Sequence, residues 1–458
     1  MPNTDLTLAP LADPVAASRS HRRRAWTVTG LLVAFMMVNF ADKSVLGLAA
    51  DRIRHDLGLS ATGFGLANSA FFLLFSLSGA LGGLLADRVR PRWLLLGMAV
   101  AWSLTQTPMA LGGGVAALVV SRIVLGAAEG PAFPVAQHTA LAWFPDHRRN
   151  LPGALISVGV TLGVVLAAPG LTWVIEHHGW RAAFAVVAVV GVVWAAAWAA
   201  LGKDRPARAD DPAGGSARDS ADDPVNDSAD VAAPRPAELH GADAATSPAP
   251  SYRRILATRT WIGATVGYFG TYWMIALSLV WVPSYLKDGL GYSASASAAV
   301  VAGIWAVNGV ALLAQAAATG WLLRRGVGSR WARGRLGGIT LLVSAAGCGV
   351  LSQTGRGPLT VLLLLVGFGL SGAMSTVAVT SVAELVPQRR RGGALGLMNA
   401  AVTLAGLVAP ALTGYLIDLR GGAGYGNAVV LAAVLLAVGG VAAVALIDPA
   451  ADARRLAR

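Results

Sequence analysis

Four charged residues lie inside apolar stretches that are long enough to cross a membrane. Asp42 and Lys43 are adjacent in the first stretch, and Arg122 and Glu129 are seven residues apart in the fourth. A charge at the centre of a membrane helix costs about 2.5–3.5 kcal/mol on insertion scales, so such residues usually face a cavity and serve a function. A carboxylate in a cavity can bind and release a proton, whereas a lysine or arginine can hold an anion.

Helical spacing places these groups on shared faces. Arg122 and Glu129 lie on nearly the same face, about two turns or 10 Å apart. Asn39 and Lys43 are four residues apart on the first helix, and Asp42 is adjacent on that polar stripe. With the first helix running outward and the fourth inward, we expect Asp42, Lys43 and Arg122 in the outer half of the membrane and Glu129 near its midplane. We predict that Asp42 and Glu129 carry protons, and that Asn39, Lys43 and Arg122 bind substrate.

The alternative for the four charges is a structural ion-pair network that does no more than join two helices. Buried ion pairs are costly to insert and are weak evidence for stability, which disfavours that interpretation. Replacing Glu129 with glutamine separates the two, because full accumulation of substrate by that variant would remove its role as a proton carrier.

The composition indicates which elements hold these residues. Of the 458 residues, 55% are hydrophobic and 13% are charged, compared with about 25% charged in typical soluble domains. Apolar runs of about 20 residues recur along the chain, and each is long enough to cross a hydrocarbon core of about 30 Å as a helix. We predict an all-α membrane protein with twelve transmembrane helices, at residues 25–48, 62–85, 93–111, 115–142, 151–175, 180–201, 260–285, 293–320, 335–354, 357–385, 394–417 and 426–447.

Basic residues predict the orientation of these helices. The net charge is +12, and the arginines cluster in alternate loops, at residues 21–24, 88–92, 148–149, 324–335, 389–391 and 454–458. This pattern follows the positive-inside rule and places both termini in the cytoplasm. We expect the same charges to contact membrane lipids, and their placement argues against nucleic acid as a partner. The Ala-, Gly- and Arg-rich composition favours a multi-pass protein of a bacterial inner (plasma) membrane.

The chain divides near its middle. Residues 202–258 are rich in Ala, Asp, Pro and Ser and cannot offset their ordering entropy by burial. Short similar segments recur on either side, with Pro145 matching Pro387 and Asp56 matching Gly289, as in transporters built from duplicated halves with a site at their interface. We predict a cytoplasmic N-terminal tail, an N-terminal six-helix bundle, a flexible cytoplasmic linker, a C-terminal six-helix bundle and a cytoplasmic tail, at residues 1–24, 25–201, 202–258, 259–447 and 448–458.

The segment GLLADRVRPR at residues 83–92 resembles the G-x-x-x-D-R-x-G-R-R signature of the major facilitator superfamily, which implies two pseudo-symmetric six-helix bundles. The segment departs from the signature at Arg90 and Pro91. The resemblance implies a cytoplasmic gate, in which a glycine permits close helix approach and an acid pairs with arginines, formed by Gly83, Asp87, Arg88 and Arg92. The alternative is that the arginines only orient the helix pair.

Three further segments resemble the anion:cation symporter family, which carries organic anions such as sugar acids and aromatic carboxylates with protons. These are NFADK at 39–43, RIVLGAAEGPAFP at 122–134 followed by WFP at 143–145, and GWRAAF at 179–184. Phe40 and Lys43 stand where the family usually has tyrosine and arginine. The resemblance implies the same roles as the spacing does: protons on Asp42 and Glu129, and an anion on Lys43 and Arg122.

The second half has no matching charges, so we expect it to supply neutral recognition groups. Serine, tyrosine and asparagine side chains lie in its seventh, tenth and eleventh predicted helices, and our candidates are Tyr272, Ser371, Ser375 and Asn399, with Asn399 favoured. Hydroxyls and amides suit a polyol acid, and aromatic rings suit a cyclic one. The alternative for each is helix–helix hydrogen bonding or packing, which is common for such groups in membranes.

We therefore predict a proton-coupled symporter that takes up a small organic anion by alternating access, and that acts as a monomer. The alternatives are a proton-coupled exporter of a small organic compound or drug, and a membrane sensor without flux. No Walker loop, H-E-x-x-H or G-x-S-x-G pattern is present, so we predict neither an enzyme nor an ATP-driven pump. We predict no cofactor and no metal site.

Overall fold

A computed structural model of the chain describes residues 14–86, 89–144, 150–203 and 250–456. Every regular element in these ranges is a helix, which confirms the all-α prediction. Asp87 and Arg88 of the predicted gate, and residues 204–249 of the predicted linker, lie outside the described residues. The boundaries given for the tails, bundles and linker stay predictions.

The first half begins with a long helix and ends with an apolar one. Its helices in the described residues are α1 (Pro14–Leu48), α2 (Ala50–Leu57), α3 (Ala61–Ala86), α4 (Pro91–Ala110), α5 (Val115–Glu129), α6 (Ala132–Leu141), α7 (Asn150–His178) and α8 (Trp180–Leu201). The fourth predicted span is α5 and α6, separated at Gly130 and Pro131, because proline has no N–H to donate to the helix. Gly130 also lies directly against the backbone of α3, where a side chain would collide.

The second half has the same succession of long helices with more irregular turns. Its helices in the described residues are α9 (Tyr252–Leu256), α10 (Arg259–Val280), α11 (Val282–Ser284), α12 (Ala294–Arg324), α13 (Leu336–Leu351), α14 (Pro358–Leu364), α15 (Ala373–Leu385), α16 (Gln388–Arg420), α17 (Gly422–Leu446) and α18 (Pro449–Leu456). Short π-helical turns are η3 (Tyr285–Gly289), η4 (Arg330–Arg335) and η5 (Leu365–Gly369), and η6 (Leu370–Gly372) is a 3₁₀ turn. The tenth predicted span is therefore interrupted where three glycines approach α12 and α13.

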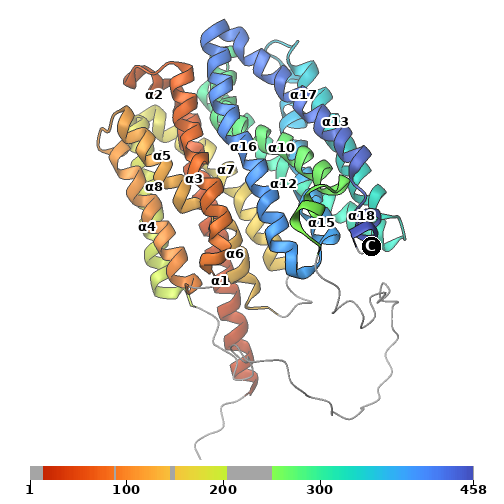
Figure 1. Cartoon of the computed structure of the whole chain (residues 1–458). Helices are drawn as coiled ribbons and strands as arrows, with labels where there is room; N and C mark the ends of the chain where they lie inside the picture. Colours follow the sequence, from red (N-terminus) through yellow and green to blue (C-terminus); the bar gives the residue numbers. More distant parts are fainter. Residues whose placement is uncertain (1–13, 87–88, 145–149, 204–249, 457–458) are drawn as a thin grey trace, which may run out of the picture.

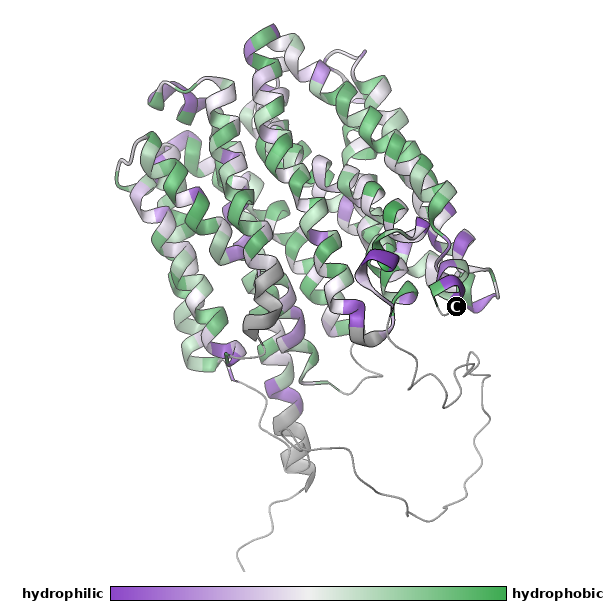
Figure 2. Cartoon of the chain, viewed as in Figure 1, coloured by the Kyte–Doolittle hydropathy of each residue, from purple (hydrophilic) through white to green (hydrophobic). Residues whose placement is uncertain are grey.

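Eleven helical segments among the described residues are long and apolar enough to cross a membrane. The remaining predicted span, the third, corresponds to α4, which is 20 residues long but more polar, with Ser103, Thr105 and Gln106 buried inside the protein. Hydrophobic residues colour most of each long helix, whereas hydrophilic ones gather at α2, at α18 and at helix ends (Figure 2). Hydropathy alone thus understates how well α4 could span a membrane, because its polar side chains face the protein rather than lipid.

The two halves meet through matching helices. In Figure 1 the long helices run side by side, and α3 packs against α16 while α7 packs against α12. These are the second with the eleventh predicted span and the fifth with the eighth, so the counterpart of the second span in the other half is the eighth, and that of the fifth is the eleventh. The contacts between the halves therefore follow the twofold pseudo-symmetry expected of duplicated bundles.

Ion pairs and caps join the halves at the end of the molecule that carries α2, called here the α2 end, uppermost in Figure 1. Asp51 of α2 forms an ion pair with Lys287 of η3 and accepts a hydrogen bond of 2.7 Å from Ser284. Asp418 of α16 accepts hydrogen bonds from the backbone N–H groups of Ala61 and Thr62, at 2.9 and 2.7 Å. Both aspartates cross from one half to the other, so the α2 end is closed.

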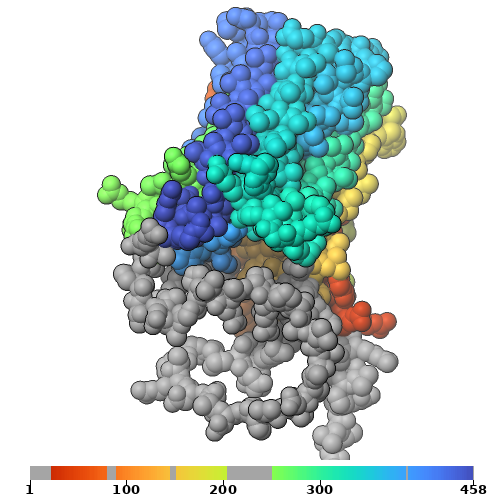
Figure 3. All heavy atoms as spheres, turned by 90° about the vertical axis from the view of Figure 1, so that its right-hand side faces the viewer, coloured from red at the N-terminus to blue at the C-terminus, as the bar shows by residue number. Residues whose placement is uncertain are grey.

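The opposite end carries α9 and α18. Figure 3 shows α9 (green) beside α18 (dark blue) at the lower end of the face formed by the second half. Arg254 donates a hydrogen bond of 3.3 Å to the carbonyl of Arg455, and Asp452 accepts one of 2.8 Å from the N–H of Thr260 at the start of α10. These contacts stay within the second half, unlike those at the α2 end.

Candidate functional site

The four charges singled out by sequence meet between α1 and α5. Asp42, Arg122 and Glu129 are only 1%, 3% and 1% exposed. The ammonium of Lys43 forms an ion pair with the carboxylate of Glu129 and donates a hydrogen bond of 2.5 Å to Asn39 Oδ1. The structure therefore brings together all five residues predicted for proton coupling and anion binding in the first half.

Gln106 of α4 joins this cluster and was not predicted. Its amide nitrogen donates a hydrogen bond to Asp42 Oδ1, and its amide oxygen accepts one of 3.1 Å from Arg122 Nη2. The side chain is fully buried. It thus bridges an acid on α1 to a cation on α5. The available signal was a glutamine in an apolar run, which carries no charge and so did not stand out.

Several buried polar atoms of the cluster lack a hydrogen-bond partner among the described residues. They are Asn39 Nδ2, Asp42 Oδ2, Arg122 Nε and Glu129 Oε1. An unsatisfied buried polar group costs about 1–3 kcal/mol, and native proteins keep few of them. Four in one cluster indicate a site whose remaining partners are a ligand, protons or water.

Aromatic rings surround the ammonium of Lys43. Its nitrogen lies 4.7, 5.6 and 5.8 Å from the ring centroids of Phe40, Phe71 and Phe75. Such rings attract a cation through their negative faces. The charge of Lys43 is therefore stabilised both by Glu129 and by these aromatic rings.

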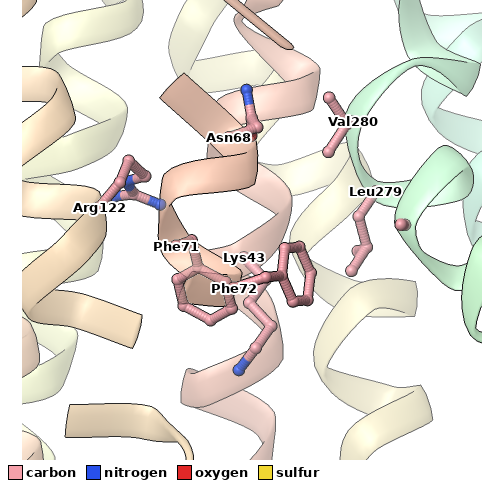
Figure 4. A pocket seen from close by; sticks show the side chains of 8 residues that line it. Lys43, Asn68, Phe71, Phe72, Arg122, Leu279 and Val280 are labelled. Carbon is pink, nitrogen blue, oxygen red and sulfur yellow. The ribbon is translucent and has the colours of Figure 1, made fainter. Parts of the chain in front are cut away.

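A cavity adjoins the cluster between the two halves. It has about 360 Å³ of empty space, part of it open, and its lining is Lys43, Asn68, Phe71, Phe72, Arg122, Ala276, Leu279 and Val280. Figure 4 shows the two phenylalanine rings beside Lys43, with Leu279 and Val280 on the other side. The cavity lies at the interface of the halves, where a transported solute would bind.

The candidates from the second half do not line this cavity. Ser371 and Ser375 donate hydrogen bonds of 2.7 Å to carbonyls of their own helical turns, those of Phe368 and Gly372. Asn399 lies close to Gly79 of α3. Tyr272 comes nearest to the cavity, since its ring centroid is 6.0 Å from that of Phe72. Their assignment to substrate binding stays a prediction.

Part of the predicted cytoplasmic gate is described. Gly83 lies in the last part of α3. Arg92, in the first turn of α4, donates a hydrogen bond of 2.8 Å to the carbonyl of Ala199 at the end of α8. That contact ties two helices of the first half together. Because Asp87 and Arg88 lie outside the described residues, the predicted acid–arginine latch is untested.

Comparisons with known proteins agree with this architecture. The model of the Major Facilitator Superfamily matches residues 31–376 and, in a second match, 327–457. The hexuronate transporter of Bacillus subtilis (strain 168) is 27% identical over 90% of this chain and 92% of its own length. The D-galactonate transporter of Escherichia coli O6:H1 is 24% identical over 95% of this chain and 98% of its own.

Solved structures give the same fold. A bacterial homologue of the human lysosomal transporter Spinster has a TM-score of 0.71 and 17% identity, covering 95% of this chain and 98% of the other. A D-xylose–proton symporter has a TM-score of 0.64 and 17% identity, covering 90% and 97%. Together with the eleven apolar helical segments in the described residues, these matches confirm the resemblance drawn from the sequence motifs. The chain belongs to the Major Facilitator Superfamily and is a multi-pass membrane transporter, not an enzyme.

Proposed function

We propose that this transporter is a proton-coupled symporter that takes up a small organic anion, such as a sugar acid or another carboxylate, by alternating access. The observation that supports it is a buried cluster of two acids and two cations beside a cavity at the interface of the halves. Relatives named for hexuronate and D-galactonate support an organic acid as the cargo.

Charge balance explains the coupling. Asp42, Glu129, Lys43 and Arg122 sum to zero when all are charged, and a net charge in a buried site is costly. A proton on Glu129 breaks the ion pair with Lys43 and leaves one excess positive charge. A substrate carboxylate on Lys43 and Arg122 restores neutrality. Proton and anion together are therefore favoured over either alone.

The proposal also includes a second proton carrier and an orientation in the membrane. We propose that Asp42 is the second proton carrier, because its Oδ2 atom has no hydrogen-bond partner among the described residues. We also propose that both termini are cytoplasmic in a bacterial inner membrane, because the basic clusters follow the positive-inside rule. The closed α2 end would then face the periplasm, and the cavity would open toward the cytoplasm.

The test is uptake into proteoliposomes under an inward proton gradient, across sugar acids, hydroxy acids and aromatic carboxylates. We expect one class to accumulate, and a protonophore to collapse the accumulation. Glu129→Gln should abolish accumulation and retain exchange of internal for external substrate, because the neutral amide mimics the protonated acid. Glu176→Gln, at an exposed position of α7, is the matched control and should accumulate normally.

Three outcomes would contradict the proposal. Accumulation by Glu129→Gln would remove that residue from proton coupling. Movement of a neutral or cationic compound against the proton gradient would make the protein an exporter. Ligand binding with no flux in either direction would make it a sensor.

A further inference from the structure

The wall that the second half contributes to the cavity is apolar. Ala276, Leu279 and Val280 of α10 are its lining residues from that half. Opposite them stand Phe71 and Phe72, whose rings pack edge to face at 4.9 Å. The charged lining groups, Lys43 and Arg122, lie in the first half. A solute in this cavity therefore meets the polar groups of the first half, which are two cations and the amide of Asn68, and hydrocarbon from the phenylalanines and from α10.

Outside the charged cluster, several polar groups near the cavity already form hydrogen bonds within the protein. Asn68 lines it, and its amide nitrogen donates a hydrogen bond of 3.0 Å to the carbonyl of Phe64. On the side of the second half, Thr271 donates one of 2.8 Å to the carbonyl of Ser371. Thr403 of α16 accepts one of 2.6 Å from Ser76. The bonds of Thr271 and Thr403 join separate helical elements, and none of Thr271, Ser371 and Thr403 lines the cavity.

A polyhydroxylated acid would be a poor fit for such walls. Each hydroxyl group transferred from water to an apolar surface without a partner loses about 10- to 100-fold in affinity. An aromatic or other apolar body instead gains from leaving water, and rings such as Phe71 and Phe72 add edge-to-face contacts.

We propose that the substrate is a carboxylate on a compact apolar body, of which a benzene ring is the fitting example. The carboxylate lies toward Lys43 and Arg122, and the body lies between the phenylalanines and α10. This inference rests on the proposed transport of an organic anion, and it selects within that class. It sets this chain apart from the relatives named for hexuronate and D-galactonate.

The test compares benzoate with D-gluconate, which carry the same single charge, in proteoliposomes without a proton gradient. Counterflow exchange of each labelled acid gives its half-saturating concentration independently of coupling. We expect that of benzoate to be at least about 10-fold lower, the loss assigned above to one unpaired hydroxyl. Equal or tighter binding of gluconate would overturn the inference and leave the proposed function standing. Exchange of neither acid, together with no gradient-driven uptake of any acid, would overturn both.

Two isosteric variants test whether the preference for benzoate over D-gluconate comes from the α10 side of the cavity. Val280→Thr places a hydroxyl in the cavity lining, whereas Val310→Thr places one at a position of α12 that is 67% exposed. We expect Val280→Thr to reduce the benzoate preference about 2- to 10-fold, the contribution of one hydrogen bond, and Val310→Thr to leave it unchanged. The ratio of two acids on one preparation does not depend on how much protein is folded. An unchanged ratio in Val280→Thr would remove this wall from selectivity.

Discussion

Gln106 links the two kinds of charge in the site. Asp42 on α1 and Arg122 on α5 each bond to one end of its amide. The neutral amide of Gln106 lies between the carboxylate of Asp42 and the guanidinium of Arg122, so that the two charged groups do not pair directly. This separation leaves Arg122 Nε and Asp42 Oδ2 without hydrogen-bond partners among the described residues, as a site for an anion and a proton requires.

We predict that Gln106→Leu lowers gradient-driven uptake by at least about 5-fold. The leucine leaves both charged partners without their shared bond, which costs about 1–3 kcal/mol. Uptake rate per folded transporter measures the effect. Gln315→Leu replaces another buried glutamine, on α12, and should reduce uptake much less. Wild-type uptake by Gln106→Leu would show that the bridge is dispensable.

The lysine at position 43 differs from the family pattern, and its contacts in the structure explain the difference. Arginine is usual at this position, with tyrosine three residues earlier, and here the pair is lysine and phenylalanine. The compact ammonium of Lys43 lies 4.7 Å from the centroid of Phe40, and Phe40 in turn packs edge to face on Trp305 of α12 at 5.7 Å. Lys43 and Phe40, the two residues that differ from the family pattern, therefore contact each other, and Phe40 also joins the halves through Trp305.

At the scale of elements, α2 and η3 form a charged contact between the halves. Asp51 and Arg54 come from α2, and Lys287 and Asp288 from η3. Burial raises the pKa of Asp51, but the ion pair with Lys287 and the hydrogen bonds with Lys287, Ser284 and Asp288 together outweigh burial, so the net shift is downward. Partial burial first, and then the negative charge of Asp51, raise the pKa of Asp288 to about 6, against the opposing cations Lys287 and Arg54. Asp288 therefore exchanges its proton in an ordinary pH range.

The direction of the pH effect follows from that shift. Opening the α2 end separates Asp288 from Asp51, and its pKa returns toward the ordinary value of 3.8. The closed state consequently binds the proton more tightly. Its extra stability is complete below the ordinary value and is lost as the pH rises through about 6. The same charges also face Tyr425 of α17.

We predict that lowering the pH from 7 to 5 raises the ratio of protein closed at the α2 end to protein open there by about 1.5- to 5-fold. This range corresponds to the energies typical of exposed charge pairs. The chain has one cysteine, Cys348. In a Cys348→Ala background, Val280→Cys reports opening through its labelling by a membrane-impermeant thiol reagent from the α2 end. The readout is the labelling rate relative to the same protein with Asp288→Asn at each pH, which cancels the titration of the thiol. A ratio that is flat with pH would contradict the prediction.

Asp56→Asn is the matched control for that measurement. Asp56 also lies on α2, but it accepts a hydrogen bond of 2.7 Å from Trp180 and pairs with Arg181 at 3.4 Å, both in the first half. Its loss should leave the pH dependence of opening unchanged, because no contact between the halves is broken.

At the scale of the whole molecule, the apolar runs predicted the helical fold well. Each predicted span has a helical counterpart in the described residues, because the bilayer leaves the backbone few alternatives to a helix. The breaks within spans were not predicted: Pro131 and the glycines between 367 and 372 continue an apolar pattern while interrupting the hydrogen-bond ladder. α2 was also missed, since eight mostly polar residues give no membrane signal.

For the candidate site, the sequence pointed to the charged residues that lie together in the structure, but not to the apolar residues that line the cavity. A charge in an apolar run stands out because its insertion is costly, which is how Asp42 and Glu129 were found. Phe71, Leu279 and Val280 are ordinary residues for membrane helices, and their role depends on packing between segments more than 200 residues apart. Sequence spacing within one helix carries no information on such contacts, so the binding roles of the polar candidates of the second half stay a prediction.

The symmetric pairing of α3 with α16 and α7 with α12 predicts where movement must occur. Alternating access requires the halves to rock against each other, so these contacts must slide or separate in each cycle. Ser76 of α3 and Thr403 of α16 are joined at 2.6 Å. We predict that Ser76→Cys with Thr403→Cys, oxidised to a disulfide in the Cys348→Ala background, stops transport by more than about 10-fold, and that reductant restores it. Each single cysteine variant should transport under the same oxidant. Undiminished transport by the cross-linked protein would mean that α3 and α16 move as one body, and that the halves exchange access by a different motion.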